Sequence, residues 1–178
     1  MEKILLDPYF RTIDTLFYPE DLERLKSLVK IIWGKDEKMP KKEWKIAKKE
    51  ASIIVTGFWR YGSVDKQNAP NLKAIIEVGG QHPSPKVLDY DTCFQRKIRV
   101  LSCAPAFAPM VAEMGLGLAI SAARDIVEAD RAIRAGSEKW HHPHVSSLYD
   151  QLVGIIGYGN LARSLKPLLD PFRCNPSI

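Results

Sequence analysis

Residues 151–178, QLVGIIGYGNLARSLKPLLDPFRCNPSI, contain the stretch that decides the fold of this chain. An apolar run, 152–156, leads into the spacing G-x-G-x-x-A, and a helical pattern begins there. In a strand–turn–helix unit the first glycine permits a tight turn, and the second lets a diphosphate approach the backbone. The third small residue lets the helix pack on the strand, and amides at the helix N-terminus hold the phosphates. Gly157, Gly159 and Ala162 therefore predict a dinucleotide site; the alternative is a glycine-rich turn without a ligand.

The sequence after this turn does not supply the rest of such a site. An acidic residue that holds the ribose is expected about 20 residues beyond the glycines, at the end of a second strand. That position falls at or just past Ile178, whereas Asp170 comes too early and lies in the helical pattern. The second strand would be RCNPSI, where Pro176 cannot donate to a central ladder. We therefore expect a chain that has been cut before the nucleotide-binding domain is complete.

Composition indicates an ordinary globular protein. The 178 residues are 46% hydrophobic and 26% charged, with a net charge of +5. The basic residues concentrate in 35–49, but acidic residues are interleaved there, and Trp44, Ala47 and Ala51 have helical spacing. A solvated helix face explains this pattern, so no nucleic-acid partner is predicted. Three separated cysteines, Cys93, Cys103 and Cys174, indicate thiols in a reducing compartment, and we expect a cytoplasmic protein.

Strand and helix patterns alternate through the first half of the chain. Continuous apolar runs predict four strands, at 3–7, 52–57, 72–80 and 98–104. Helical patterns lie between them, at 19–33, 41–51 and 88–97. Alternation of this kind predicts an α/β fold with a flavodoxin-like parallel sheet, whose carboxyl-terminal strand ends are available for ligands.

One long helix is predicted from about Pro109 to Ala135, closed by Gly136, with a linker after it. Pro109 suits a first-turn position. The almost wholly apolar stretch 104–123 contains prolines, glycines and Glu113, so a helix buried between layers or at a subunit interface explains it better than a membrane span. The predicted organisation is therefore a substrate domain (1–104), a connecting helix and linker (105–150), and the incomplete start of a Rossmann domain (151–178).

Other candidate sites are weighed in the same way. Val78, Gly79 and Gly80 follow a strand, and exposed backbone amides there would hold a small carboxylate; the alternative is a plain turn. His82 follows closely and is considered as a general base, but it has no evident carboxylate partner to tune it. His141, His142 and His144 have no zinc-site spacing, so no metal is predicted. Glu113 is interpreted as a structural anchor that must be paired if it is ionised.

Three stretches together resemble the D-isomer-specific 2-hydroxyacid dehydrogenase family, in its phosphoglycerate dehydrogenase-like branch. They are LKAIIEVGG, the stretch from LDYDTCFQRKIRV through ARDIVEADRAIRAG, and LVGIIGYGNLARSLKPLLDPF. The second is the more specific signal, because V-A-E within a long apolar helix that leads to A-D-R-A-x-R-A-G is not expected of a generic α/β protein. The resemblance implies two α/β domains flanking a cleft and dimers that pack through the long helix. It also implies that Tyr158, Gly159, Asn160 and Leu161 contact the NAD diphosphate, and that the backbone of Val78 and Gly79 holds the substrate carboxylate.

The resemblance further implies hydride transfer between the nicotinamide and a small 2-hydroxy or 2-keto acid. A histidine, a glutamate and an arginine carry that chemistry in the family, and all three come from later parts of the NAD domain. We therefore expect no catalytic residue in this chain and no turnover by it alone. The loop GGQHPSPKVLDYD departs from the shorter family pattern, so the substrate stays open, as does the choice between NAD and NADP. The alternative function is a non-catalytic, NAD-sensing binding protein of the same fold, similar to some transcriptional corepressors.

Overall fold

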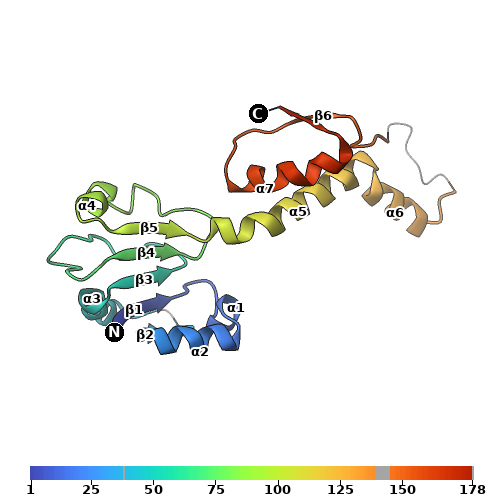
Figure 1. The fold of residues 1–178 in the computed structure, drawn as a ribbon. Coiled ribbons are helices and arrows are strands. Elements are labelled where there is room, and N and C mark those ends of the chain that lie inside the picture. Colours follow the sequence, from blue (N-terminus) through green and yellow to red (C-terminus); the bar gives the residue numbers. More distant parts are fainter. Residues whose placement is uncertain (38, 139–144, 178) are drawn as a thin grey trace. The chain divides into compact units, whose positions relative to one another are not determined.

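The computed structural model describes residues 1–37, 39–138 and 145–177 (Figure 1). Clustering of contacts divides the chain into two compact units, Met1–Ala104 and Pro105–Ile178. The first unit contains a five-stranded sheet in the order β2-β1-β3-β4-β5, and each neighbouring pair is parallel. Its strands are β1 (Glu2–Asp7), β2 (Val29–Gly34), β3 (Ile53–Thr56), β4 (Ala74–Glu77) and β5 (Arg99–Ser102). This order is that of flavodoxin-like folds, and the predicted fold class is confirmed.

Helices cover both faces of this sheet. The short α1 (Ile13–Leu16) and α2 (Pro19–Leu28) contribute apolar side chains to a core that contains Ile4, Leu6 and Val55. On the other face, α3 (Lys41–Glu50) and α4 (Tyr90–Gln95) pack on the larger core around Leu5, Ile54 and Ile75. Successive residues of a buried strand point to opposite faces, so a continuous apolar run supplies both cores.

The segment 19–33 is not one helix, as its periodicity predicts, but a helix followed by a strand. α2 ends at Leu28, and the next residue begins β2, which pairs with β1. Val29, Ile31 and Ile32 are β-branched, and branched side chains pack well on a pleated sheet. Pairing with β1 and burial of Trp33 therefore outweigh the local helical spacing.

The basic helix α3 is solvated on one face, as predicted, with one exception. Lys48 is buried, and its Nζ donates hydrogen bonds to the carbonyl oxygens of Tyr61 (3.1 Å) and Ser63 (2.6 Å). The ammonium group also lies 4.9 Å from the ring centre of Trp44. Burial lowers the pKa of Lys48. This lysine fixes the loop that follows β3, which carries residues of the candidate site.

The predicted single helix 109–135 is two helices in the second unit. α5 spans Ala104–Ala123 and α6 spans Ile126–Arg134. Between them Asp125 has a positive φ of 52°, which ends the helical backbone. The helix also begins earlier than predicted: Pro105 lies in its first turn, and Pro109 lies inside it. Gly136, with φ 75°, follows the end of α6 as predicted.

The second unit also contains the predicted strand–turn–helix. β6 (Leu152–Gly154) precedes the glycines and α7 (Asn160–Leu169) follows them. A 3₁₀ turn (Asp170–Phe172) then leads into β7 (Asn175–Ser177), which pairs with β6 in parallel. The segment containing Pro176 is thus a strand. Asp170 lies just past the end of α7.

Candidate functional site

The glycine turn has the backbone that a diphosphate site requires. Gly157 adopts φ 84°, a conformation that favours glycine, and so turns the chain sharply after β6. Gly159 is the N-cap residue of α7, with φ −85° and ψ −161°, which any residue can adopt. A Cβ added at either glycine would meet no atom of the described residues within 4 Å. The backbone on this side of the turn is therefore open to a ligand.

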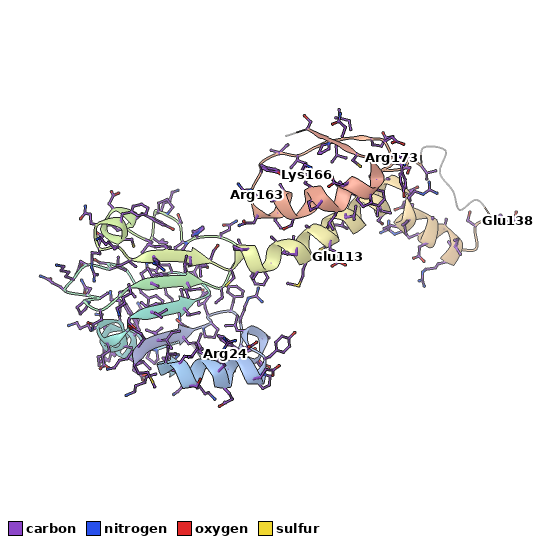
Figure 2. All side chains as sticks on the ribbon, in the orientation of Figure 1. Arg24, Glu113, Glu138, Arg163, Lys166 and Arg173 are labelled. Atoms are coloured by element: carbon purple, nitrogen blue, oxygen red, sulfur yellow. The ribbon has the colours of Figure 1, made fainter. Side chains whose placement is uncertain are left out.

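The first turn of α7 supplies the donors at this site. The amides of Asn160, Leu161 and Ala162 belong to the helix N-terminus, where N–H groups have no acceptor within the helix. The Ala162 side chain is buried, as the packing role of the third small residue predicts, whereas Tyr158 and Leu161 are exposed. Figure 2 shows Arg163 and Lys166 along α7. The Arg163 guanidinium lies 5.8 Å from the ring centre of Tyr158 and adds positive charge beside the turn.

The second candidate site lies at the carboxyl edge of the first unit's sheet. Val78 is buried and its N–H donates to the carbonyl of Thr56 (3.0 Å), so this amide is committed to the sheet. Gly79 is half-buried and Gly80 is exposed, and neither N–H donates to another described residue. Of the three predicted residues, Gly79 and Gly80 therefore offer free amides, and Val78 positions them.

Three charged groups at this edge were missed by sequence reasoning. Asp7 ends β1 and is buried; its Oδ2 accepts from Arg60 Nη2 at 2.6 Å and from the hydroxyl of Tyr61. The Arg60 guanidinium also lies 4.7 Å from the ring centre of Tyr9. Glu77 ends β4 and is buried directly before Val78. A charged residue that directly follows an apolar strand was the signal that could have identified Asp7 and Glu77.

The remaining sequence candidates are not gathered into a site. His82 is exposed in the loop after β4. Glu113, which was expected to be a paired structural anchor, is exposed on α5 (Figure 2), where solvent can stabilise its charge. His141, His142 and His144 lie outside the described residues. Among residues 1–37, 39–138 and 145–177, no three His, Cys, Asp or Glu side chains are grouped as metal ligands. The three cysteines are free thiols, one buried and two half-buried.

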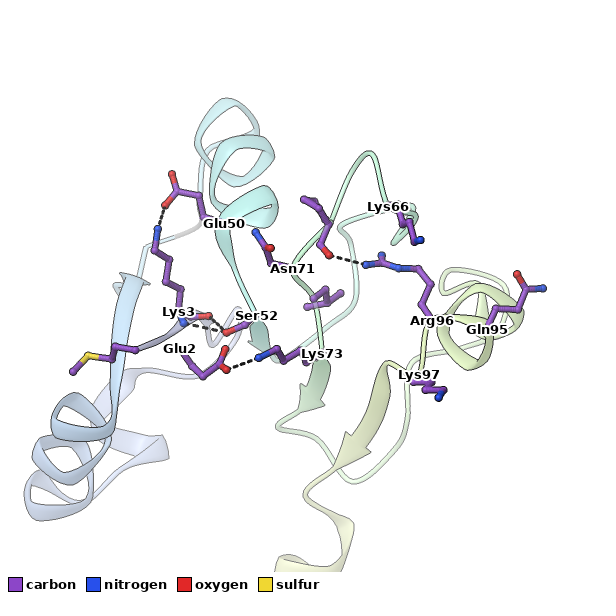
Figure 3. Close-up of a pocket in the computed structure, with 13 residues that line it drawn as sticks. Glu2, Lys3, Glu50, Ser52, Lys66, Asn71, Lys73, Gln95, Arg96 and Lys97 are labelled. Carbon is purple, nitrogen blue, oxygen red and sulfur yellow. Dashed lines mark hydrogen bonds and ion pairs between the residues drawn. The ribbon is translucent and has the colours of Figure 1, made fainter.

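A pocket of about 710 Å³ lies at the opposite, amino edge of the same sheet (Figure 3). Four of its charged residues form two ion pairs: Lys3 Nζ lies 2.7 Å from Glu50, and Lys73 pairs with Glu2. Hydrogen bonds from these lysines lower the pKa of both carboxyls. Ligands of open parallel sheets bind at the carboxyl ends of strands, so we assign this pocket no role in the chemistry.

Comparisons of sequence lead to one family. The profile described as "D-isomer specific 2-hydroxyacid dehydrogenase, NAD binding domain" matches residues 116–177. A glyoxylate reductase of Thermococcus litoralis is 28% identical over 159 residues, which are 83% of this chain and 46% of the relative. A hydroxypyruvate reductase of Thermotoga maritima is 31% identical over 97 residues, or 53% of this chain and 30% of the relative. The chain thus spans less than half the length of either protein.

Comparison of structures agrees with the sequences. The crystal structure of a phosphoglycerate oxidoreductase from Rhizobium etli matches 99% of this chain and 54% of its own, with a TM-score of 0.74 and 28% identity. The match includes the parallel sheet, the α5 segment and the glycine turn, because it covers nearly the whole chain. The profile match covers the turn at 157–162, and the structural match covers both the parallel sheet and this turn. Together these matches place the chain in the D-isomer-specific 2-hydroxyacid dehydrogenase family, with residues 116–177 matching the family's NAD-binding domain.

Proposed function

We propose that this chain provides the substrate domain and the first β–α–β unit of the coenzyme domain of an NAD-dependent oxidoreductase that acts on a small 2-hydroxy or 2-keto acid. NADP is not excluded as the coenzyme. The observation that carries the proposal is the turn at Gly157–Ala162, whose open backbone and helix N-terminus fit a diphosphate. The names of the relatives, glyoxylate and hydroxypyruvate reductase, support a two- or three-carbon acid.

In this proposal, one set of backbone amides binds the coenzyme and another set binds the substrate. Those of Gly159, Asn160, Leu161 and Ala162 hold the coenzyme diphosphate, with Gly157 and Tyr158 shaping the turn. The amides that follow Val78 hold the substrate carboxylate. The bound coenzyme supplies hydride transfer to or from the substrate carbonyl carbon. No residue of 1–178 matches the family's catalytic arginine, glutamate or histidine, so we expect 1–178 alone to bind without turnover.

A second copy of the chain is the proposed partner of α5. Among the described residues, α5 is the one helix long and apolar enough to cross a membrane, and only 11% of its apolar window is buried. Met110, Met114 and Leu118 form an exposed stripe at i, i+4, i+8. A Cβ added at Gly115 or Gly117 would contact nothing within 4 Å among the described residues, so these positions leave space for a second helix to approach. Pro109 and the charged Glu113 favour a protein interface over a bilayer.

The proposed compartment is the cytoplasm, where thiols stay reduced.

The experiment that tests the proposed function joins residues 1–177 to the remaining part of the Thermococcus litoralis glyoxylate reductase, which supplies the missing catalytic groups. We expect the chimera to oxidise NADH or NADPH with glyoxylate or hydroxypyruvate, and residues 1–178 alone to show no turnover. A folded chimera that binds NADH but reduces neither acid would favour the NAD-sensing alternative. A folded chimera that binds neither coenzyme would contradict both readings.

A further inference from the structure

Glu77 occupies an unusual position beside the proposed carboxylate site. It is the last residue of β4, and by the alternation of a strand its side chain lies on the same face as Ile75, towards α4. The residue is only 8% exposed. Its Oε1 lies 3.5 Å from the point where a Cβ on Gly79 would stand. The carboxyl group is therefore next to the backbone that carries the free amides of Gly79 and Gly80.

The Glu77 side chain has no partner among the described residues. The other two buried charged side chains of the described residues have partners: Asp7 Oδ2 accepts from Arg60 and Tyr61, although Oδ1 has no partner, and Lys48 donates to two carbonyl oxygens. No hydrogen bond or ion pair reaches the Glu77 carboxyl group in the described part of the chain. A buried carboxylate without a donor is unfavourable, so an unpaired carboxyl is most stable when it is neutral.

The groups packed around Glu77 do not favour its charged form. α4 contributes Tyr90, whose hydroxyl donates to the carbonyl of Pro83 (2.6 Å). The strand ends on either side contribute Thr56 and Ser102, with Cys103 following. Burial raises the pKa of Cys103 and of Glu77 alike, which leaves both neutral in a wider pH range. Two cations belong to this end of the unit: Arg11, whose charge acts on the Cys103 thiol, and Arg60, whose Nη2 pairs with Asp7.

We propose that protonated Glu77 donates a hydrogen bond to an anionic ligand group held at the Gly79–Gly80 turn, so that binding of a carboxylate is coupled to the uptake of one proton. The proton comes from solvent, and no covalent bond of the ligand changes. Glu77 is thus a specificity-determining residue: ionised, it repels the carboxylate; protonated, it completes the donor set. The inference rests on the proposed substrate site and adds a pH dependence that the site's amides alone cannot produce.

The test is a titration of residues 1–178 with glyoxylate, which stays anionic throughout, at pH 5.5, 6.5 and 7.5. Amide resonances of Gly79 and Gly80 report binding, and Glu77→Gln is the matched variant because it keeps a donor that cannot ionise. We expect the wild-type affinity to fall towards tenfold per pH unit above the pKa of Glu77. We expect the affinity of Glu77→Gln to be constant across the range. The amide spectrum itself shows whether the variant is folded.

Two failures can be told apart. If Gly79 and Gly80 respond equally at all three pH values in both proteins, the substrate site stands and the role of Glu77 is wrong. If they respond in neither protein at any pH, the substrate assignment fails and the inference falls with it. A carbon-detected titration of the Glu77 carboxyl without ligand gives an independent result, because an ordinary pKa there would also overturn the inference.

Discussion

Pro176 of β7 lies opposite Val153 of β6 in a parallel pair. The hydrogen bonds on either side explain how a proline fits there: Asn175 N–H donates to Gln151, and Ile155 N–H donates to Ser177. Alternate residues of a strand direct their N–H groups to opposite sides, so the missing donor of Pro176 faces away from β6. β7 therefore continues the β–α–β unit. The missing N–H of Pro176 would affect only a strand that pairs with the other edge of β7.

The two glycines of the turn should respond differently to alanine. Gly157→Ala places a side chain at φ 84° and should destabilise the second unit by about 1–2 kcal/mol. Gly159→Ala has an ordinary φ and open space, and should change stability by less than about 0.5 kcal/mol. Chemical denaturation of both variants measures the difference. Equal losses of stability in the two variants would contradict the positive φ of Gly157.

The Asp7–Arg60 pair should be important for the first unit. Arg60→Ala leaves a buried carboxylate without its cation and should lower the free energy of unfolding by about 3 kcal/mol. Tyr61→Phe removes one neutral donor and should cost about 1 kcal/mol. Thermal unfolding of each variant at several denaturant concentrations measures its loss of unfolding free energy. A loss for Arg60→Ala no larger than that for Tyr61→Phe would contradict the structural role of the ion pair.

Glu77 should also make stability depend on pH without any ligand. Burial raises its folded-state pKa above 4.5, so the favourable contribution of the protonated form is complete below pH 4.5 and is lost as the pH rises through the folded pKa. Glu77→Gln should therefore match the wild type near pH 4 and be more stable at pH 7. Unfolding curves at both pH values measure this, and a wild type that is the more stable at pH 7 would disprove it.

The stripe on α5 should hold two copies together. Met114→Glu places a charge in the middle of the apolar surface formed by Met110, Met114 and Leu118, and should convert a dimer into a monomer. Arg24→Glu, at an exposed position of α2 (Figure 2), is the matched control. Light scattering after gel filtration gives the mass of each. A wild type that is monomeric at every concentration would contradict the proposed interface.

Much of the fold could be predicted because its signals are local. The apolar runs of β1, β3, β4 and β5 and the glycine turn each occupy a few consecutive residues. β2 was hidden because its residues also fit a helical period, and only pairing with β1 decides between the two. The break at Asp125 depends on a positive φ at a residue that is not glycine. Asp7 and Arg60 are 53 positions apart, and only the fold brings them together.

The most direct test of the central claim is an amide-resolved NMR titration of residues 1–178 with NADH, with Gly159→Ala as the matched variant. We predict saturable shifts centred on Gly157–Ala162, with a Kd of the order of 1 mM for a partial site. The folded Gly159→Ala protein should not respond, because its added Cβ fills the space that the diphosphate needs. Shifts that are absent from the wild type at several millimolar NADH, or identical in the variant, would contradict it.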